Sequence, residues 1–215
     1  MSHHRKEVMF ATVAEPLTFE AFLAWDDGTG RSFELRDGMP MPITEPNAKH
    51  EDLIQRLCAF LDHHCVAQDC PYVPRQSKQI RLGNNPTTGR EESRKADIVV
   101  FATSEWERMR QSSMSAAAYI PPPLVIKVVS TNWADDYDTK FLEYEALGIS
   151  EYWIVDYGAF GGIRYIGKPK QPTITLNRLI NGEYQSQLFR ENDRIVSSIL
   201  TELELTAAQI FAMAD

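Results

Sequence analysis

The chain has 215 residues and a net charge of −8 at pH 7, with an isoelectric point near 5.2. This acidic balance excludes a general nucleic-acid coat protein, which would carry a basic surface. No apolar run approaches the roughly 20 residues that a membrane-spanning helix needs, so we expect no membrane contact. Residues 1–7 lack the apolar core of a signal peptide, which predicts a cytoplasmic protein.

The three cysteines predict free thiols. Cys58, Cys65 and Cys70 are odd in number and lie within one predicted helix and its exit, with no fourth cysteine to complete a disulfide framework or a zinc site. His63 and His64 beside them give only a weak metal pattern. A reducing compartment agrees with the cytoplasmic location.

The first predicted elements are a short helix, a hairpin and a longer helix. Residues 18–25 form a helix with Thr18 as its N-cap, and residues 33–41 form two short strands around Asp37-Gly38, a strong hairpin signal. Asn47 then caps a helix over residues 48–64, whose apolar positions fall on one stripe.

The later elements alternate between strands and helices. The patterns predict strands over residues 72–82, 94–101, 123–130 and 149–157, helices over residues 105–115 and 135–147, a hairpin around Asn181-Gly182, and a final helix over residues 206–213. We expect a single α/β (α+β) domain over residues 1–215, built on one mixed β-sheet flanked by helices. The N-terminal helix and hairpin form an extension, as do the C-terminal hairpin and helix.

Two isolated charges interrupt strands that are otherwise apolar. Asp97 lies in Ala96-Asp97-Ile98-Val99-Val100, and Lys127 lies in Val125-Ile126-Lys127-Val128-Val129. Apolar runs of this length indicate interior strands, where a charge costs several kcal/mol unless it is paired or coordinated. Together, the two residues predict a functional site.

One stretch of the chain is clearly basic. Residues 75–95 hold six basic side chains and two acidic ones, the basic ones being Arg75, Lys78, Arg81, Arg90, Arg94 and Lys95. A solvated hairpin and a contact surface for phosphates explain this stretch equally well.

A larger pattern in the sequence resembles a known family. It runs from the Gly38 hairpin and His50 through Asp97 to Leu124-Val125-Ile126-Lys127-Val128-Val129-Ser130, and continues through residues 136–140 and Tyr144 to Gly148-Ile149-Ser150-Glu151-Tyr152-Trp153-Ile154-Val155-Asp156. This pattern resembles the bacterial family of restriction-endonuclease-like proteins in the PD-(D/E)XK nuclease superfamily, over residues 18–156. The resemblance implies a restriction-endonuclease-like fold and hydrolysis of phosphodiesters with Mg²⁺ or Mn²⁺.

The resemblance also assigns roles to residues. Asp97 corresponds to the first metal-binding carboxylate, and Lys140 to a catalytic lysine displaced onto the following helix. His50, Arg75, Gln76 and Lys78 become candidate nucleic-acid contacts, with DNA as the expected partner and a homodimer as the expected assembly.

The sequence departs from the family at one decisive position. Lys127 stands where the family carries its second metal-binding carboxylate, a glutamate. A protonated lysine does not ligate a metal, and its ammonium in this place is expected to pair with Asp97 and fill the metal's position. Glu34 or Glu51 remain as replacement ligands. We therefore keep Lys127 as a candidate catalytic residue whose role is altered.

Ordinary structural roles are open for the same residues. As alternatives, Asp97 pairs with Arg94 or Lys95, Lys127 extends its ammonium beyond a sheet edge, and Lys140 pairs with Asp136 at i+4.

Three functions follow from these patterns. The first is a metal-dependent DNA endonuclease with an altered site. The second is a nuclease-fold protein without catalysis that binds nucleic acid or a protein partner. The third is an assembly or regulatory protein with no nucleic-acid partner.

Overall fold

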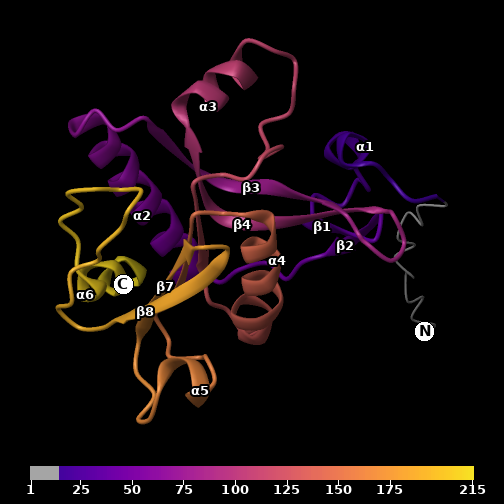
Figure 1. Cartoon of the computed structure of the whole chain (residues 1–215). Coiled ribbons are helices and arrows are strands. Elements are labelled where there is room, and N and C mark those ends of the chain that lie inside the picture. The colour runs from indigo at the N-terminus through magenta and orange to yellow at the C-terminus, as the bar shows by residue number, and fades with distance from the viewer. Residues whose placement is uncertain (1–14) are drawn as a thin grey trace, which may run out of the picture.

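The computed structural model describes residues 15–215 as a mixed β-sheet with helices packed on both faces (Figure 1). Residues 1–7, on which the expectation of a cytoplasmic protein partly rests, lie outside the described residues. No helix within residues 15–215 is long and apolar enough to cross a membrane.

Six strands form the main sheet, in the order β3-β4-β5-β6-β7-β8. They are β3 (Tyr72–Asn84), β4 (Glu91–Ala102), β5 (Leu124–Val128), β6 (Glu151–Asp156), β7 (Thr173–Ile180) and β8 (Glu183–Phe189). Strands β5 and β6 run parallel and the other neighbours run antiparallel. The parallel pair is joined through helix α4 (Lys140–Leu147), because parallel neighbours need a long crossover. The expected mixed sheet flanked by helices is confirmed.

The central strands are apolar on both sides because each face of the sheet is covered. Helix α2 (Ala48–Ala67) packs Leu57 and Leu61 against one face, where Ile126 and Trp153 lie, and α6 (Ala207–Phe211) covers the same face. The other face packs against α3 (Thr103–Arg110), α4 and α5 (Ile163–Ile166), with Tyr144 of α4 in contact with Tyr152. Alternation along β5 then places Lys127 on the α4 side of the sheet.

The N-terminal extension forms a second, smaller sheet beside β4. Helix α1 (Phe19–Ala24) is capped by Thr18, as expected, and β1 (Phe33–Arg36) pairs with β2 (Met39–Pro42). Leu35 and Phe19 are completely buried in a small core of their own, and the Leu35 amide donates to Ser93 of β4 over 3.3 Å. This packing holds β1 beside β4 of the main sheet (Figure 1). Glu34 is a residue of β1.

Several helices differ from the expectation. Helix α2 extends to Ala67 rather than ending at residue 64, and the predicted final helix is α6 followed by a 3-10 turn, Ala212–Ala214. Helix α3 spans Thr103–Arg110 rather than residues 105–115, because the chain turns directly from β4 into the helix and Ser112 then bonds back to the Met109 carbonyl. The predicted helix over residues 135–147 begins with a π-helical turn, Asp135–Thr139, before α4. Helix α5 was not predicted, since its four residues are too few for a helical pattern.

The hairpin glycine of the extension is a sensitive position. Gly38 and Gly182 occupy the same place in two-residue hairpins and have φ values of +74° and +89°. A Cβ on Gly38 would lie 2.6 Å from the Pro16 Cβ, whereas a Cβ on Gly182 meets no atom within 4 Å. We predict that Gly38→Ala lowers the free energy of unfolding by about 3 kcal/mol and Gly182→Ala by about 1 kcal/mol. Urea unfolding followed by circular dichroism measures both, and equal losses would contradict the prediction.

Candidate functional site

The site forms where β4 and β5 separate. Backbone pairing between the two strands covers Ile98–Val100 and Leu124–Ile126, so Asp97 and Lys127 are the next opposed residues after pairing ends. In a regular strand, Ala96 and Ile98 would face the same side of the sheet. Here Ala96 lies in the core cluster with Val99 and Ile98 lies in the cluster on the opposite side, so the alternation of β4 is interrupted at Asp97. The Asp97 side chain therefore points into the gap between the strands. We call this gap the fork.

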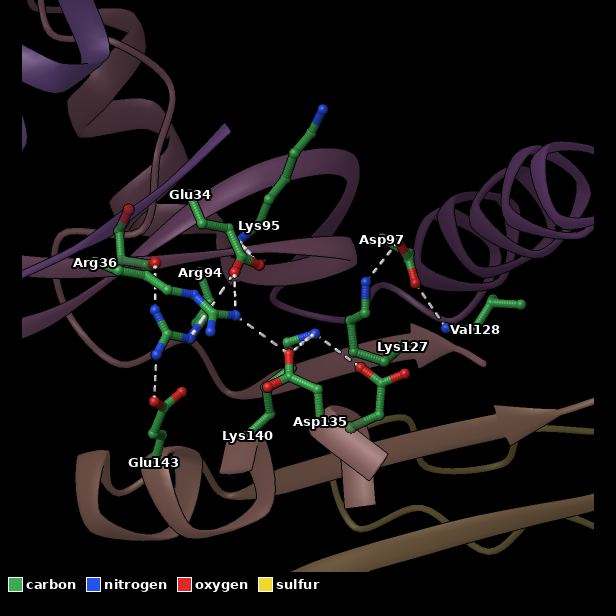
Figure 2. Close-up of polar contacts among 12 residues, drawn as sticks. Glu34, Arg36, Arg94, Lys95, Asp97, Lys127, Val128, Asp135, Lys140 and Glu143 are labelled. Carbon is green, nitrogen blue, oxygen red and sulfur yellow. Dashed lines mark hydrogen bonds and ion pairs between the residues drawn. The ribbon is translucent and has the colours of Figure 1, made fainter. Parts of the chain in front are cut away.

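Both oxygens of Asp97 are occupied. Lys127 Nζ donates to Oδ1 over 2.9 Å, and the Val128 amide donates to Oδ2 over 2.7 Å (Figure 2). The two side chains are 13% and 12% exposed, so the ion pair is only slightly hydrated. The expected pairing of Lys127 with Asp97 is present, and Asp97 forms no ion pair with Arg94 or Lys95.

His50 closes the fork from the other side of the sheet. It lies in the first turn of α2, which Asn47 caps by accepting from the His50 amide over 3.0 Å. Its Nε2 lies 2.9 Å from the Val128 carbonyl and 3.8 Å from Asp97 Oδ2. Since a carbonyl only accepts, Nε2 donates, and the buried Nδ1 is left without a partner.

Lys140 lies close to the fork but bonds to its own helix. Its ammonium contacts Asp136 over 2.8 Å, the i+4 pair anticipated from the sequence, and Asp135 over 3.0 Å. The π-helical turn brings Asp135 within reach, because it places residues five apart on one side of the helix. Burial disfavours the Lys140 cation, yet Asp136, Glu34 and Asp135 outweigh burial and raise its pKa, so Lys140 stays protonated. Burial raises the pKa of Asp136, although Lys140 and Lys127 oppose the shift.

Further charges connect Lys140 to the N-terminal hairpin. Glu34 of β1 accepts from the Lys95 amide over 3.1 Å and from Arg36 over 3.2 Å. Arg94 is 5% exposed and lies between Glu34 and Glu143 of α4, with an ion pair to each (Figure 2). The residues around the fork form one charge cluster, which comprises Glu34, Arg36, Arg94, Asp97, Lys127, Asp135, Asp136, Lys140 and Glu143.

The residues present do not fit a divalent cation. Mg²⁺ requires several free oxygen ligands, but the Lys127 ammonium and the Val128 amide already occupy the two oxygens of Asp97. Glu34, the first possible replacement ligand, is engaged by Arg36 and Arg94, and Glu51 is exposed. Within residues 15–215, no group of three acidic, histidine or cysteine side chains is arranged to hold a metal ion.

The basic stretch is largely neutralised within the fold. Arginines in it pair with acidic side chains, namely Arg75 with Asp62, Arg81 with Glu91, Arg90 with Asp37 and Arg94 with Glu143. Gln76 and Lys78 pair with Ile98 and Ala96, so they lie on the strand beside Asp97, as expected. Lys78 forms no ion pair among the described residues, and Lys95 donates to the Ser32 hydroxyl. Fewer basic side chains of residues 75–95 are therefore available to contact phosphates than the sequence indicated.

Comparison with known proteins places this chain in a family. Among solved structures, a protein of Anabaena variabilis described as a "putative nuclease belonging to DUF820" superposes with a TM-score of 0.67 at 20% identity, covering 93% of this chain and 99% of that one. This likeness shows that the two chains share a fold. The family model named Uma2 and described as "Putative restriction endonuclease" matches residues 19–208. The chain therefore belongs to the Uma2 family. No curated protein sequence matches it significantly.

The sequence identified the residues at the fork but not the outer residues of the charge cluster. Asp97, Lys127, Lys140 and His50 converge at or beside the fork, whereas Arg75 lies away from it against Asp62 and Trp106. Arg36, Arg94 and Glu143 join the cluster through contacts between residues far apart in the chain. No local sequence pattern marked these contacts.

Removing Arg94 is expected to destabilise the protein strongly at neutral pH. Arg94→Met leaves the partly buried Glu143 without its cation and the buried Glu34 with Arg36 alone, so the free energy of unfolding should fall by about 3 to 5 kcal/mol. Burial already raises the pKa of Glu143, while Arg94 opposes that shift. Without Arg94 the pKa rises further, so the carboxyl protonates more readily and the loss should shrink as the pH falls from 7 towards 4.

Urea unfolding at several pH values measures this effect. Arg164→Met is the matched control, because Arg164 also pairs with an acid, Asp138, but is 71% exposed. It should change stability by less than about 1 kcal/mol. A loss for Arg94→Met that does not depend on pH would contradict the electrostatic explanation.

Proposed function

We propose that this protein is a nuclease-fold member that does not hydrolyse phosphodiesters with a divalent cation, and that it acts by binding nucleic acid. The observation that carries the proposal is the ion pair between Lys127 and Asp97, 2.9 Å long and almost excluded from water. Metal-assisted hydrolysis needs a cation that activates water and polarises the phosphate. An ammonium held by Asp97 supplies neither an open coordination position nor an activated water.

Three features support binding to nucleic acid. Membership of the Uma2 family supplies the association with nucleases. Lys78 and Lys95 lie on β3 and β4 near Asp97, without ion-pair partners among residues 15–215, so they are available to phosphates. The Lys127 side chain, which is 12% exposed, lies at the same fork. The many internal arginine pairs and the net charge of −8 make this surface small, so binding should be weak and sensitive to salt.

The catalytic function implied by the family is the competing proposal. It assigns Mg²⁺ or Mn²⁺ to Asp97 and charge stabilisation to Lys140. It requires the Lys127–Asp97 pair to open and Lys140 to leave Asp135 and Asp136 when substrate binds. Nucleic-acid binding without hydrolysis is favoured here, because breaking each of these ion pairs leaves a charge buried without its partner.

We predict no metal-dependent nicking of supercoiled plasmid by the wild-type protein. The assay compares Mg²⁺, Mn²⁺ and EDTA, with Asp97→Ala run in parallel to identify contaminating nuclease. Nicking by the wild-type protein that is lost in Asp97→Ala would contradict the proposal and establish the endonuclease function instead.

We also predict binding of nucleic acid that persists in EDTA. Fluorescence anisotropy with labelled single- and double-stranded DNA and RNA should give affinities that fall steeply with salt. Lys78→Ala and Lys95→Ala should each weaken binding and reduce the salt slope by about 1, since each removes one phosphate contact. Lys168→Ala is the control, because Lys168 is exposed in the segment between α5 and β7. Absence of binding to every probe would favour an assembly or regulatory role.

A further inference from the structure

The charges of the cluster nearly balance, and Lys127 is necessary for that balance. The cluster holds five carboxylates, of Glu34, Asp97, Asp135, Asp136 and Glu143. It holds four cationic side chains, of Arg36, Arg94, Lys127 and Lys140. The formal excess is therefore one negative charge. Loss of Lys127 would double this excess in a region where several of the side chains are less than about a tenth exposed.

Lys127 is also the cation that spans the fork. Arg94, Arg36 and Lys140 contact carboxylates of β1, α4 and the π-helical turn, whereas Lys127 joins β5 to Asp97 of β4. The strands have no backbone pairing at this level, since their register ends at Ile98 and Ile126. The Asp97 carboxylate bridges the gap through Lys127 and the Val128 amide (Figure 2).

We propose that the Lys127 ammonium is a built-in cation that takes over the structural and electrostatic role of a divalent cation at the fork. A lysine carries a charge of +1, which equals the sum of one carboxylate and one divalent cation. The exchange of that combination for a lysine therefore leaves the cluster charge unchanged. Reversing the charge of residue 127 should accordingly turn the fork into a site that requires a divalent cation.

The chemistry of lysine suits this role. Its ammonium is a compact point charge on a flexible stem, so one carboxylate oxygen is enough to hold it. Because the cation is covalently attached, chelators do not remove it and no metal is needed to complete the fold. This inference deepens the proposed function, since both depend on the Lys127–Asp97 pair, but its test uses no nucleic acid.

The test measures thermal unfolding of three proteins with EDTA, Mg²⁺, Mn²⁺ or Ca²⁺. In EDTA, Lys127→Glu should lower Tm by roughly 10 °C, because two carboxylates then face each other across the fork. Mn²⁺ or Mg²⁺ should recover at least about half of that loss by binding the folded state. The wild-type protein and the surface charge reversal Lys168→Glu should change by less than about 1 °C with any of these ions. Isothermal titration of Mn²⁺ should show binding to Lys127→Glu at least about tenfold tighter than to the wild-type protein.

A second set of variants decides the question if Lys127→Glu fails to fold. Lys127→Met and Asp97→Asn each remove one partner of the pair and should each lower Tm without conferring a response to metals. The double variant should lose clearly less than the sum of the two single losses, because neither charge is then left unpaired.

The outcomes separate the two proposals. Three outcomes would each overturn the proposal that Lys127 is a built-in cation. They are a rise in Tm of the wild-type protein with metal ions, no such rise in a folded Lys127→Glu variant, and additive losses in the double-variant cycle. None of these results depends on whether nucleic acid binds. Metal-dependent nicking by the wild-type protein would instead overturn the proposed function.

Discussion

The ion pair between Lys127 and Asp97 is the interaction on which the site depends. It lies where two central strands stop pairing, so each backbone is close to the other but no longer bonded to it. A carboxylate in such a gap must find donors, and Asp97 finds the Lys127 ammonium and the Val128 amide. The desolvation penalty of each charge is offset only while the other is present. The fork is therefore closed by two side chains that stabilise each other.

The rest of the charge cluster links the N-terminal hairpin to the helix side of the sheet. Glu34 of β1 is held by Arg36 and Arg94, and Arg94 in turn holds Glu143 of α4. This chain of contacts makes the position of the hairpin and the position of α4 interdependent. The π-helical turn belongs to the same arrangement, because it lets one lysine, Lys140, pair with two successive aspartates. Asp97 and Lys140, the two residues to which the family resemblance assigns catalytic roles, are thus both engaged in ion pairs within the fold.

Membership of the Uma2 family and the fold do not by themselves fix what this chain does, since a fold carries many functions and the site decides between them. Here Lys127 stands opposite Asp97, at the position where the resemblance to the family implies a glutamate. A pair of carboxylates would attract metal ions, whereas Lys127 and Asp97 neutralise each other, so the fork offers no open metal ligand. Our proposal of nucleic-acid binding without hydrolysis rests on this difference and on Lys78 and Lys95 beside the fork.

The sequence by itself determined the order of strands and helices apart from α5, the mixed sheet, the α2 cap at Asn47 and the pairing of Lys127 with Asp97. These follow from local patterns, because an isolated charge in an apolar strand or a capping residue before an amphipathic run is visible within a few positions. Only the tertiary structure decided that Arg94 lies between Glu34 and Glu143, and that most arginines of residues 75–95 are neutralised internally. Such partners lie on strands and helices far apart in the chain. Which charges become neighbours depends on how the hairpin, sheet and α4 pack, and no local pattern encodes that choice.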